Sequence, residues 1–184
     1  RRVVGENCLY YLKSKKELVL MALYVDDMLI ASTSEKLLRG VKEAFSKTYQ
    51  MKDLGEVKHI LGMKVDINRE KKTIGINQRA YIEAMLVRFG LTEALPCSTP
   101  VDHKVRLSKS MCPQSETEKL ATAGMPYREA VGSLLWLANG RRPDIAYAVN
   151  QVATYLNNPG IEHWEAVIRI MKYLRLLMMV IVVI

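Results

Sequence analysis

Short apolar runs separated by a tight break open the chain. Runs at 18–23 and 28–31 have the length of strands, and the break between them is Tyr24-Val25-Asp26-Asp27. This pattern predicts two buried strands joined by a tight hairpin turn. Favoured two-residue turns need positive φ and are commonly Asn-Gly or Asp-Gly, yet this break contains no glycine. Two carboxylates therefore stand side by side next to the predicted core.

A helix and a second hairpin follow along the chain. Apolar residues at helical spacing between 37 and 45 predict a helix with one apolar face and one cationic face. Strands are then predicted at 60–65 and 73–77, joined by the charged loop 66–72. Gly62 lies inside the first of these strands, which indicates either a bulge or the close approach of another backbone or a ligand.

Helical periodicity dominates the second half. A helix is predicted at 82–89, and apolar stripes at 131–138, 145–156 and 164–174 predict a small antiparallel bundle. Residues 92–126 lose this periodicity and contain four prolines, which indicates a long, mobile connection. The bundle carries cations that are either phosphate contacts or solvated surface: Arg141, Arg142, Arg169, Lys172 and Arg175.

These elements predict an α+β fold in distinct parts. Residues 1–91 hold the hairpins and a helix, 92–126 form the linker and domain boundary, and 127–175 form the helical bundle. The chain then ends in nine consecutive apolar residues at 176–184, too few to span a bilayer, which takes roughly 20. This uncharged tail has an aggregation-prone pattern, and our hypothesis for it is a frameshift or a wrongly predicted gene end.

The composition is that of a folded protein with a basic surplus. The 184 residues are 49% hydrophobic and 25% charged, with a net charge of +8. Residues 1–92 hold 17 Lys and Arg against 11 Asp and Glu, and such a surplus favours a polyanionic partner. Cys8, Cys97 and Cys112 match neither a disulfide framework nor a zinc motif, and no signal peptide is evident. An intracellular, non-secreted protein is therefore expected.

The paired carboxylates of Asp26 and Asp27 carry the candidate chemistry. Two like charges beside a hydrophobic core cost on the order of several kcal/mol unless they are compensated. A bound divalent cation would remove that cost. Carboxylate oxygens suit Mg²⁺, which binds one or two carboxylates together with substrate phosphates. The alternative is a solvated turn whose two acids only keep the hairpin soluble.

The turn Tyr24-Val25-Asp26-Asp27 between two strands resembles the catalytic turn of reverse transcriptases. The neighbouring blocks are similar to copia-type (Pseudoviridae) LTR retrotransposons, in the C-terminal part of the polymerase region of their Pol polyprotein. They occur in the family's order at 24–32, 51–56, 60–65, 76–78, 81–83, 98–100, 131–134, 142–146 and 163–166. Ordered blocks on this scale are far more specific than a lone YxDD motif.

The resemblance implies an RNA-directed DNA polymerase that adds nucleotides to a primer 3′-hydroxyl by a two-metal mechanism. Asp26 and Asp27 would be catalytic and would bind Mg²⁺, with Mn²⁺ as a substitute. The implied contacts with primer and nucleotide are Tyr24, Val25, Leu61, Gly62 and Met63. The last three belong to a hairpin that matches the family's primer grip. Without the resemblance, the same hairpin would be read as a plain edge hairpin of the sheet.

The resemblance also implies architecture and partners. Residues 1–91 would be a partial polymerase palm, and 127–175 would be the thumb and connection region. The implied partners are an RNA or DNA template with its primer, and deoxynucleotide triphosphates, with no membrane. The implied location is a cytoplasmic virus-like particle or the nucleus.

The family has further active-site parts that this sequence does not match. A third palm aspartate comes from an earlier strand, and fingers residues bind the nucleotide triphosphate, but no aspartate precedes Asp26 here. We therefore expect a fragment that is inactive alone. Two other interpretations remain: a non-catalytic nucleic-acid-binding remnant of a degenerate element, and an unrelated helical interaction protein with a chance YVDD.

Overall fold

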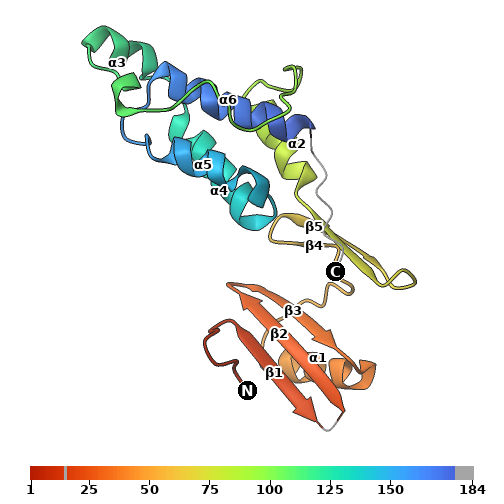
Figure 1. The fold of residues 1–184 in the computed structure, drawn as a ribbon. Coiled ribbons are helices and arrows are strands. Elements are labelled where there is room, and N and C mark those ends of the chain that lie inside the picture. The colour runs from red at the N-terminus through yellow and green to blue at the C-terminus, as the bar shows by residue number, and fades with distance from the viewer. Residues whose placement is uncertain (15, 177–184) are drawn as a thin grey trace. The chain divides into compact units, whose positions relative to one another are not determined.

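The structure is a computed structural model that describes residues 1–14 and 16–176 (Figure 1). These residues form an α+β fold with two three-stranded sheets and six α-helices, which confirms the predicted fold class. The chain divides into two compact units, Arg1–Ile60 and Leu61–Ile184. Of the apolar tail expected at 176–184, only Leu176 is among the described residues.

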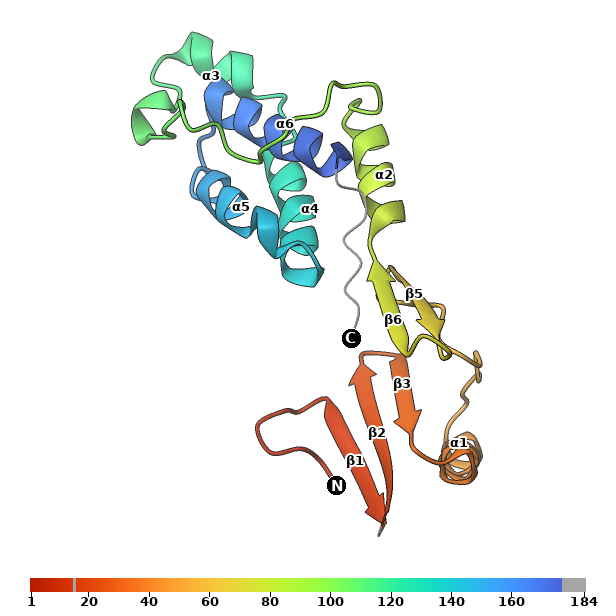
Figure 2. The same ribbon diagram turned by 45° about the vertical axis from the view of Figure 1, so that its right-hand side comes forward.

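The first unit is a β-meander with a helix on one face of its sheet (Figure 2). Strands β1 (Leu9–Ser14), β2 (Glu17–Tyr24) and β3 (Asp27–Ser32) pair antiparallel in that order, and α1 (Glu35–Thr48) follows. The last residue of β2 pairs directly with the first residue of β3. This register confirms the predicted tight hairpin.

The strands of this unit are less buried than their apolar sequences predict. Val19 is fully buried, and its cross-strand partner Leu12 lines a shallow hollow together with residues of α1. Leu20, the next residue, points to the opposite face and is 40% exposed. The prediction of two buried strands is therefore wrong, because α1 covers one face of the sheet and leaves the opposite face open to solvent.

A second small sheet has the strand order β4-β5-β6. Strand β4 (His59–Ile60) precedes β5 (Met63–Asn68), and β5 pairs antiparallel with β6 (Thr73–Asn77). Leu61 and Gly62 form the turn between β4 and β5 with φ values of 50° and 72°. A type I′ hairpin turn requires positive φ at both central residues. Gly62 is thus a turn residue, and the bulge predicted there is wrong.

Four helices of the second unit share one hydrophobic core: α2 (Arg79–Arg88), α4 (Tyr127–Gly140), α5 (Ala146–Ala153) and α6 (Ile161–Leu176). The apolar stripes read from the sequence supply the buried residues, which confirms these helices. Fully buried stripe residues include Val131, Leu134, Val149, Val167, Met171 and Leu174, and Leu137 and Ile170 of the same helices are also fully buried. Ile82 of α2 packs in the same core, so α2 belongs with these helices.

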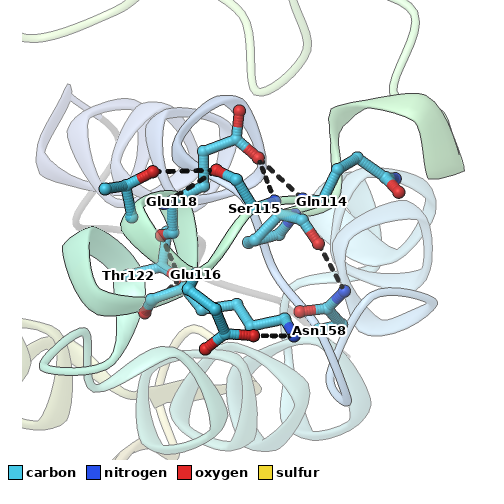
Figure 3. Close-up of polar contacts among 9 residues, drawn as sticks. Gln114, Ser115, Glu116, Glu118, Thr122 and Asn158 are labelled. Atoms are coloured by element: carbon cyan, nitrogen blue, oxygen red, sulfur yellow. Dashed lines mark hydrogen bonds and ion pairs between the residues drawn. The ribbon is translucent and has the colours of Figure 1, made fainter.

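The predicted linker 92–126 contains a 3₁₀ turn, η1 (Lys109–Met111), and a short helix, α3 (Glu116–Thr122). Ser115 caps α3 in a capping box, and Asn158 donates a hydrogen bond to the segment just before it (Figure 3). The compact units divide at 60/61 rather than in this segment, which lies within the second unit. Among the described residues, no helix has the length and apolarity needed to cross a bilayer.

Candidate active site

The turn between β2 and β3 places Val25 and Asp26 at its apex and Asp27 at the start of β3. Val25 has a φ of 52°. This left-handed conformation is strained for a β-branched residue and costs about 1–3 kcal/mol. An Asn-Gly turn would avoid that cost. Backbone strain of this kind clusters at functional sites, so the apex is a candidate for one.

The carboxylates of Asp26 and Asp27 are both exposed at this apex. Within the described residues, neither carboxylate forms an ion pair or a hydrogen bond with another side chain. The predicted crowding of two charges beside the core is therefore wrong, because the apex is open to solvent. Desolvation gives no reason for a cation here, and the case for one rests on the donor atoms themselves.

Two adjacent carboxylates suit a hard divalent cation. Mg²⁺ commonly takes one or two carboxylates and completes its octahedron with water and substrate phosphate oxygens. No group of three or more metal-binding His, Cys, Asp or Glu side chains is assembled in the described part of the chain. Asp26 and Asp27 are therefore donors of the type that such a cation takes, with substrate phosphates as its further ligands.

The other predicted contact residues lie at two separate turns. Tyr24 is 54% and Val25 is 81% exposed, so both side chains at the first turn are open to a ligand. Leu61 and Met63 are half-buried and flank the exposed Gly62 in the second turn. No atom lies within 4 Å of an ideal Cβ at Gly62, so its positive φ, and not lack of space, calls for glycine there. The first turn belongs to the first unit and the second turn to the second unit.

Arg142, two residues after α4, is buried and paired with a carboxylate, so both roles predicted for it, a phosphate contact and solvated surface, are wrong. It is 2% exposed, precedes η2 (Pro143–Ile145), and donates from Nε and Nη2 to the Asp144 carboxylate at 2.8 and 2.7 Å. The Tyr173 hydroxyl donates to the same carboxylate at 3.0 Å. Burial alone would raise the pKa of Asp144, but the Arg142 and Tyr173 hydrogen bonds hold it below its usual value.

A buried histidine fixes the connecting segment to the start of α6. The backbone N–H of Gly160 donates to Nδ1 of His163 at 2.9 Å, so the ring hydrogen lies on Nε2, which donates to the Ser108 carbonyl at 3.2 Å. Tyr155 stacks on the ring with 3.9 Å between centroids. Burial lowers the pKa of His163, while the Ser108 carbonyl acts in the opposite direction. The sequence gives no signal for this role, because Ser108 and His163 are 55 residues apart.

Comparison with known proteins supplies a family for this chain. The model of the family described as "Reverse transcriptase (RNA-dependent DNA polymerase)" matches residues 2–103. The retrovirus-related Pol polyprotein from transposon TNT 1-94 of Nicotiana tabacum is 43% identical over 175 residues, which cover 95% of this chain and 13% of that protein. The corresponding protein from transposon RE1 of Arabidopsis thaliana is 35% identical over 171 residues, covering 93% of this chain and 11% of that protein.

A shorter relative matches over the same region. The putative transposon Ty5-1 protein YCL074W of Saccharomyces cerevisiae is 33% identical over 175 residues, which cover 92% of this chain and 53% of that protein. The chain thus spans about half of this relative and 13% or less of the two plant polyproteins. No solved structure matches the chain. The named relatives are transposon proteins, which confirms the resemblance drawn from the sequence blocks.

Proposed function

Because the chain belongs to the reverse transcriptase (RNA-dependent DNA polymerase) family, we propose that it is part of the polymerase of a copia-type retrotransposon Pol polyprotein. In this proposal residues 1–91 contribute to the palm and 127–175 to the thumb and connection region. The activity proposed for the whole polymerase is transfer of a deoxynucleotide onto a primer 3′-hydroxyl. Similarity to transposon Pol polyproteins over more than nine-tenths of the chain supports this assignment.

The observation that carries the proposal is the strained, exposed apex with two unpaired carboxylates. Asp26 would be the main cation ligand, and Asp27 would support it from the start of β3. Divalent cations, when bound, stabilise the attacking and leaving oxygens of a phosphoryl transfer. Tyr24 and Val25 would meet the primer terminus and the incoming sugar from the same tip, since both side chains are open to solvent.

The second turn and the basic surplus each suit a nucleic-acid partner. Leu61, Gly62 and Met63 would hold the primer backbone, for which a tight type I′ turn presents an exposed glycine. The net charge of +8 favours a template–primer duplex over a neutral or acidic partner. We propose a cytoplasmic virus-like particle or the nucleus as its compartment, on the basis of the family.

We further propose that residues 1–184 do not polymerise alone. The two carboxylates form a half-site, and the family's third aspartate has no counterpart before Asp26. The purified chain is therefore expected to give no primer extension on a poly(rA) template with an oligo(dT) primer and Mg²⁺. Extension by the purified chain that disappears in Asp26→Asn would contradict this proposal.

A chimera tests the function itself. Residues 1–184 replace the matching segment of the transposon TNT 1-94 Pol polyprotein, and Mg²⁺-dependent primer extension is measured. The chimera is expected to extend the primer, and Asp26→Asn is expected to lower the rate by about 100-fold or more, because a cation ligand is lost. The matched control is Asp66→Asn, which changes an exposed carboxylate that pairs with Lys64 at 2.9 Å.

The chimera separates the proposal from its alternative. Equal activity of the chimera and its Asp26→Asn variant would contradict a catalytic role for the apex. A chimera that binds the duplex but extends no primer would favour the non-catalytic remnant.

A further inference from the structure

The β2–β3 hairpin presents Asp26 and Asp27 at its tip in one particular pairing register. In this register Tyr24 pairs with Asp27, and Val25 and Asp26 form a two-residue turn. A two-residue hairpin turn with positive φ at its first central residue normally has glycine there, whereas Val25 has a φ of 52°. The conformation of the turn therefore opposes the register that the turn closes.

A slip of one residue would remove this strain. Tyr24 would then pair with Met28, and residues 25–27 would form a three-residue loop, in which the last residue is left-handed. That residue would be Asp27, and aspartate tolerates this conformation far better than valine. The slip would also draw Asp27 out of β3 and turn every β3 side chain to the opposite face of the sheet.

The apolar pattern of β3 opposes this slip only weakly. Successive strand residues point to opposite faces of a sheet, so Met28 and Ile30 share one face. Leu29 and Ala31 share the other. Because both faces are apolar, a slip exchanges one apolar set for another instead of exposing the only one. Another feature of the hairpin has to select the register.

Thr33, the residue after β3, closes the far end of the hairpin. Its backbone N–H donates to the Leu18 carbonyl at 3.0 Å. Its Oγ1 accepts from the Leu18 N–H at 2.9 Å and donates to the Leu18 carbonyl at 3.4 Å. In a regular antiparallel pair the two residues exchange both backbone bonds. Here the Thr33 hydroxyl accepts the bond that a carbonyl accepts in such a pair.

The next residue cannot take over this role after a slip. A one-residue slip would place Ser34 opposite Leu18. The Ser34 N–H already donates to Oγ of Ser32 at 3.1 Å, and its carbonyl accepts from the same hydroxyl at 2.9 Å. Helix α1 then begins at Glu35. The bonds to Leu18 are therefore specific to the observed register.

We infer that Thr33 is a positioning residue for Asp26 and Asp27: its hydroxyl selects the hairpin register in which the turn presents both carboxylates. The inference rests on the proposed function and deepens it by naming a residue that acts on the cation ligands without contacting them. Six residue pairs separate Thr33 from the turn. This separation does not weaken the effect, because a slip shifts every pair of a strand together.

The first readout is the register itself, measured by NMR on the full chain. Met21 and Ile30 lie opposite each other in a non-hydrogen-bonded pair, in which the Cα atoms are about 4.5 Å apart. A nuclear Overhauser effect between their Hα atoms therefore reports the observed register. Thr33→Val keeps the shape of the side chain and removes the hydroxyl. It is expected to weaken this signal and to produce one between Met21 and Ala31, whereas Thr33→Ser is expected to behave as the wild type.

The second readout is the cation requirement of the turn. Only chains in the observed register present the proposed ligands, so Thr33→Val is expected to weaken Mn²⁺ binding at residues 24–28, seen as broadening of their amide signals, by about threefold. Saturating Mn²⁺ is expected to restore the Met21–Ile30 signal. In the chimera with the transposon TNT 1-94 Pol polyprotein, the Mg²⁺ concentration for half-maximal extension is expected to rise about threefold. The rate at saturating Mg²⁺ should stay within about twofold of the wild type, because bound cation selects the observed register.

Thr48→Val is the matched control. It removes another hydroxyl of the first unit that bonds the backbone, since Thr48 Oγ1 donates to the Ala44 carbonyl at 3.1 Å. This variant is expected to leave the Met21–Ile30 signal and the Mn²⁺ affinity unchanged, even where it lowers the melting temperature. A purely structural role of Thr33 would give the same result in Thr33→Val.

Each contrary outcome has a distinct meaning. An unchanged Met21–Ile30 signal in Thr33→Val, without a Met21–Ala31 signal, would overturn the inference and leave the proposed function standing. A slipped register with the Mn²⁺ affinity of the wild type would overturn it as well, and so would a Thr33→Ser variant that behaves as Thr33→Val. Absence of broadening at residues 24–28 in the wild type would instead contradict the cation site of the proposed function, and this inference with it.

Discussion

Val25 holds conformational strain in the turn that carries Asp26 and Asp27. Its φ of 52° is unfavourable for a side chain branched at Cβ, and an 81% exposed side chain gains little packing in return. Six consecutive residue pairs between β2 and β3 fix the turn against this strain. The apex is therefore held in place by the hairpin, which presents Asp26 and Asp27 in one arrangement.

Val25→Gly is expected to stabilise the hairpin by about 1 kcal/mol. Glycine relieves the left-handed strain, and its extra freedom in the unfolded chain offsets part of that gain. Amide hydrogen exchange of β2 and β3 measures the free energy of local opening. Val25→Ala keeps a Cβ and should gain less than Val25→Gly. Faster exchange in Val25→Gly than in the wild type would show that the turn is not strained.

At the scale of elements, periodic segments are predicted well and segments held by single contacts are not. The helix stripes around Leu134, Val149 and Val167 follow directly from apolar spacing, and each of these residues is buried. The segment 92–126 has no period, yet the His163–Ser108 hydrogen bond fastens it to α6. The sequence alone does not distinguish a bulge at Gly62 from a type I′ turn, because both use glycine.

His163 makes this attachment sensitive to acid. Its pKa is lowered in the folded chain because the ring is buried, so the folded state disfavours the charged ring. Protonation would also put a hydrogen on Nδ1 against the Gly160 N–H that now donates to it. The neutral ring therefore contributes stability above the unfolded-state pKa of about 6.5. That contribution is lost as the pH falls from there through the folded pKa.

Urea unfolding at several pH values tests this dependence. The unfolding free energy of the wild type is expected to fall between pH 7 and pH 5 more steeply than that of His163→Asn, which carries no titrating ring. The groups facing the ring include the Ser108 carbonyl, the Tyr155 ring and the Glu162 carboxylate, and Glu162 acts to raise the pKa. Parallel pH profiles for the two proteins would show that His163 does not titrate on unfolding.

At the scale of the whole molecule, apolar sequence reveals an element but not what covers it. The apolar runs at 18–23 and 28–31 predict buried strands, yet Leu20 is 40% exposed beside the fully buried Val19. Burial of a strand depends on the layer packed against it, and that information lies in other segments. The placement of α2 in the helical core follows from contacts of Ile82 with residues far along the chain, which its own sequence does not encode.

The candidate site shows the same division between what a sequence encodes and what it does not. The ordered blocks and the YVDD turn were enough to identify the family, because they lie in local sequence. The sequence does not predict three other features of the site, because each depends on neighbours brought in by the fold. They are the exposure of both carboxylates, the strain at Val25 and the burial of Arg142.

Binding of a divalent cation at the hairpin apex is tested most directly by titrating the full chain with Mn²⁺, a paramagnetic substitute for Mg²⁺, while recording its amide NMR spectrum. The amide signals of residues 24–28 are expected to broaden first and to recover when excess Mg²⁺ is added. In the double variant Asp26→Asn/Asp27→Asn they should stay sharp, and in Asp66→Asn they should broaden as in the wild type. Broadening centred elsewhere, or unchanged in the double variant, would contradict a cation site at Asp26 and Asp27.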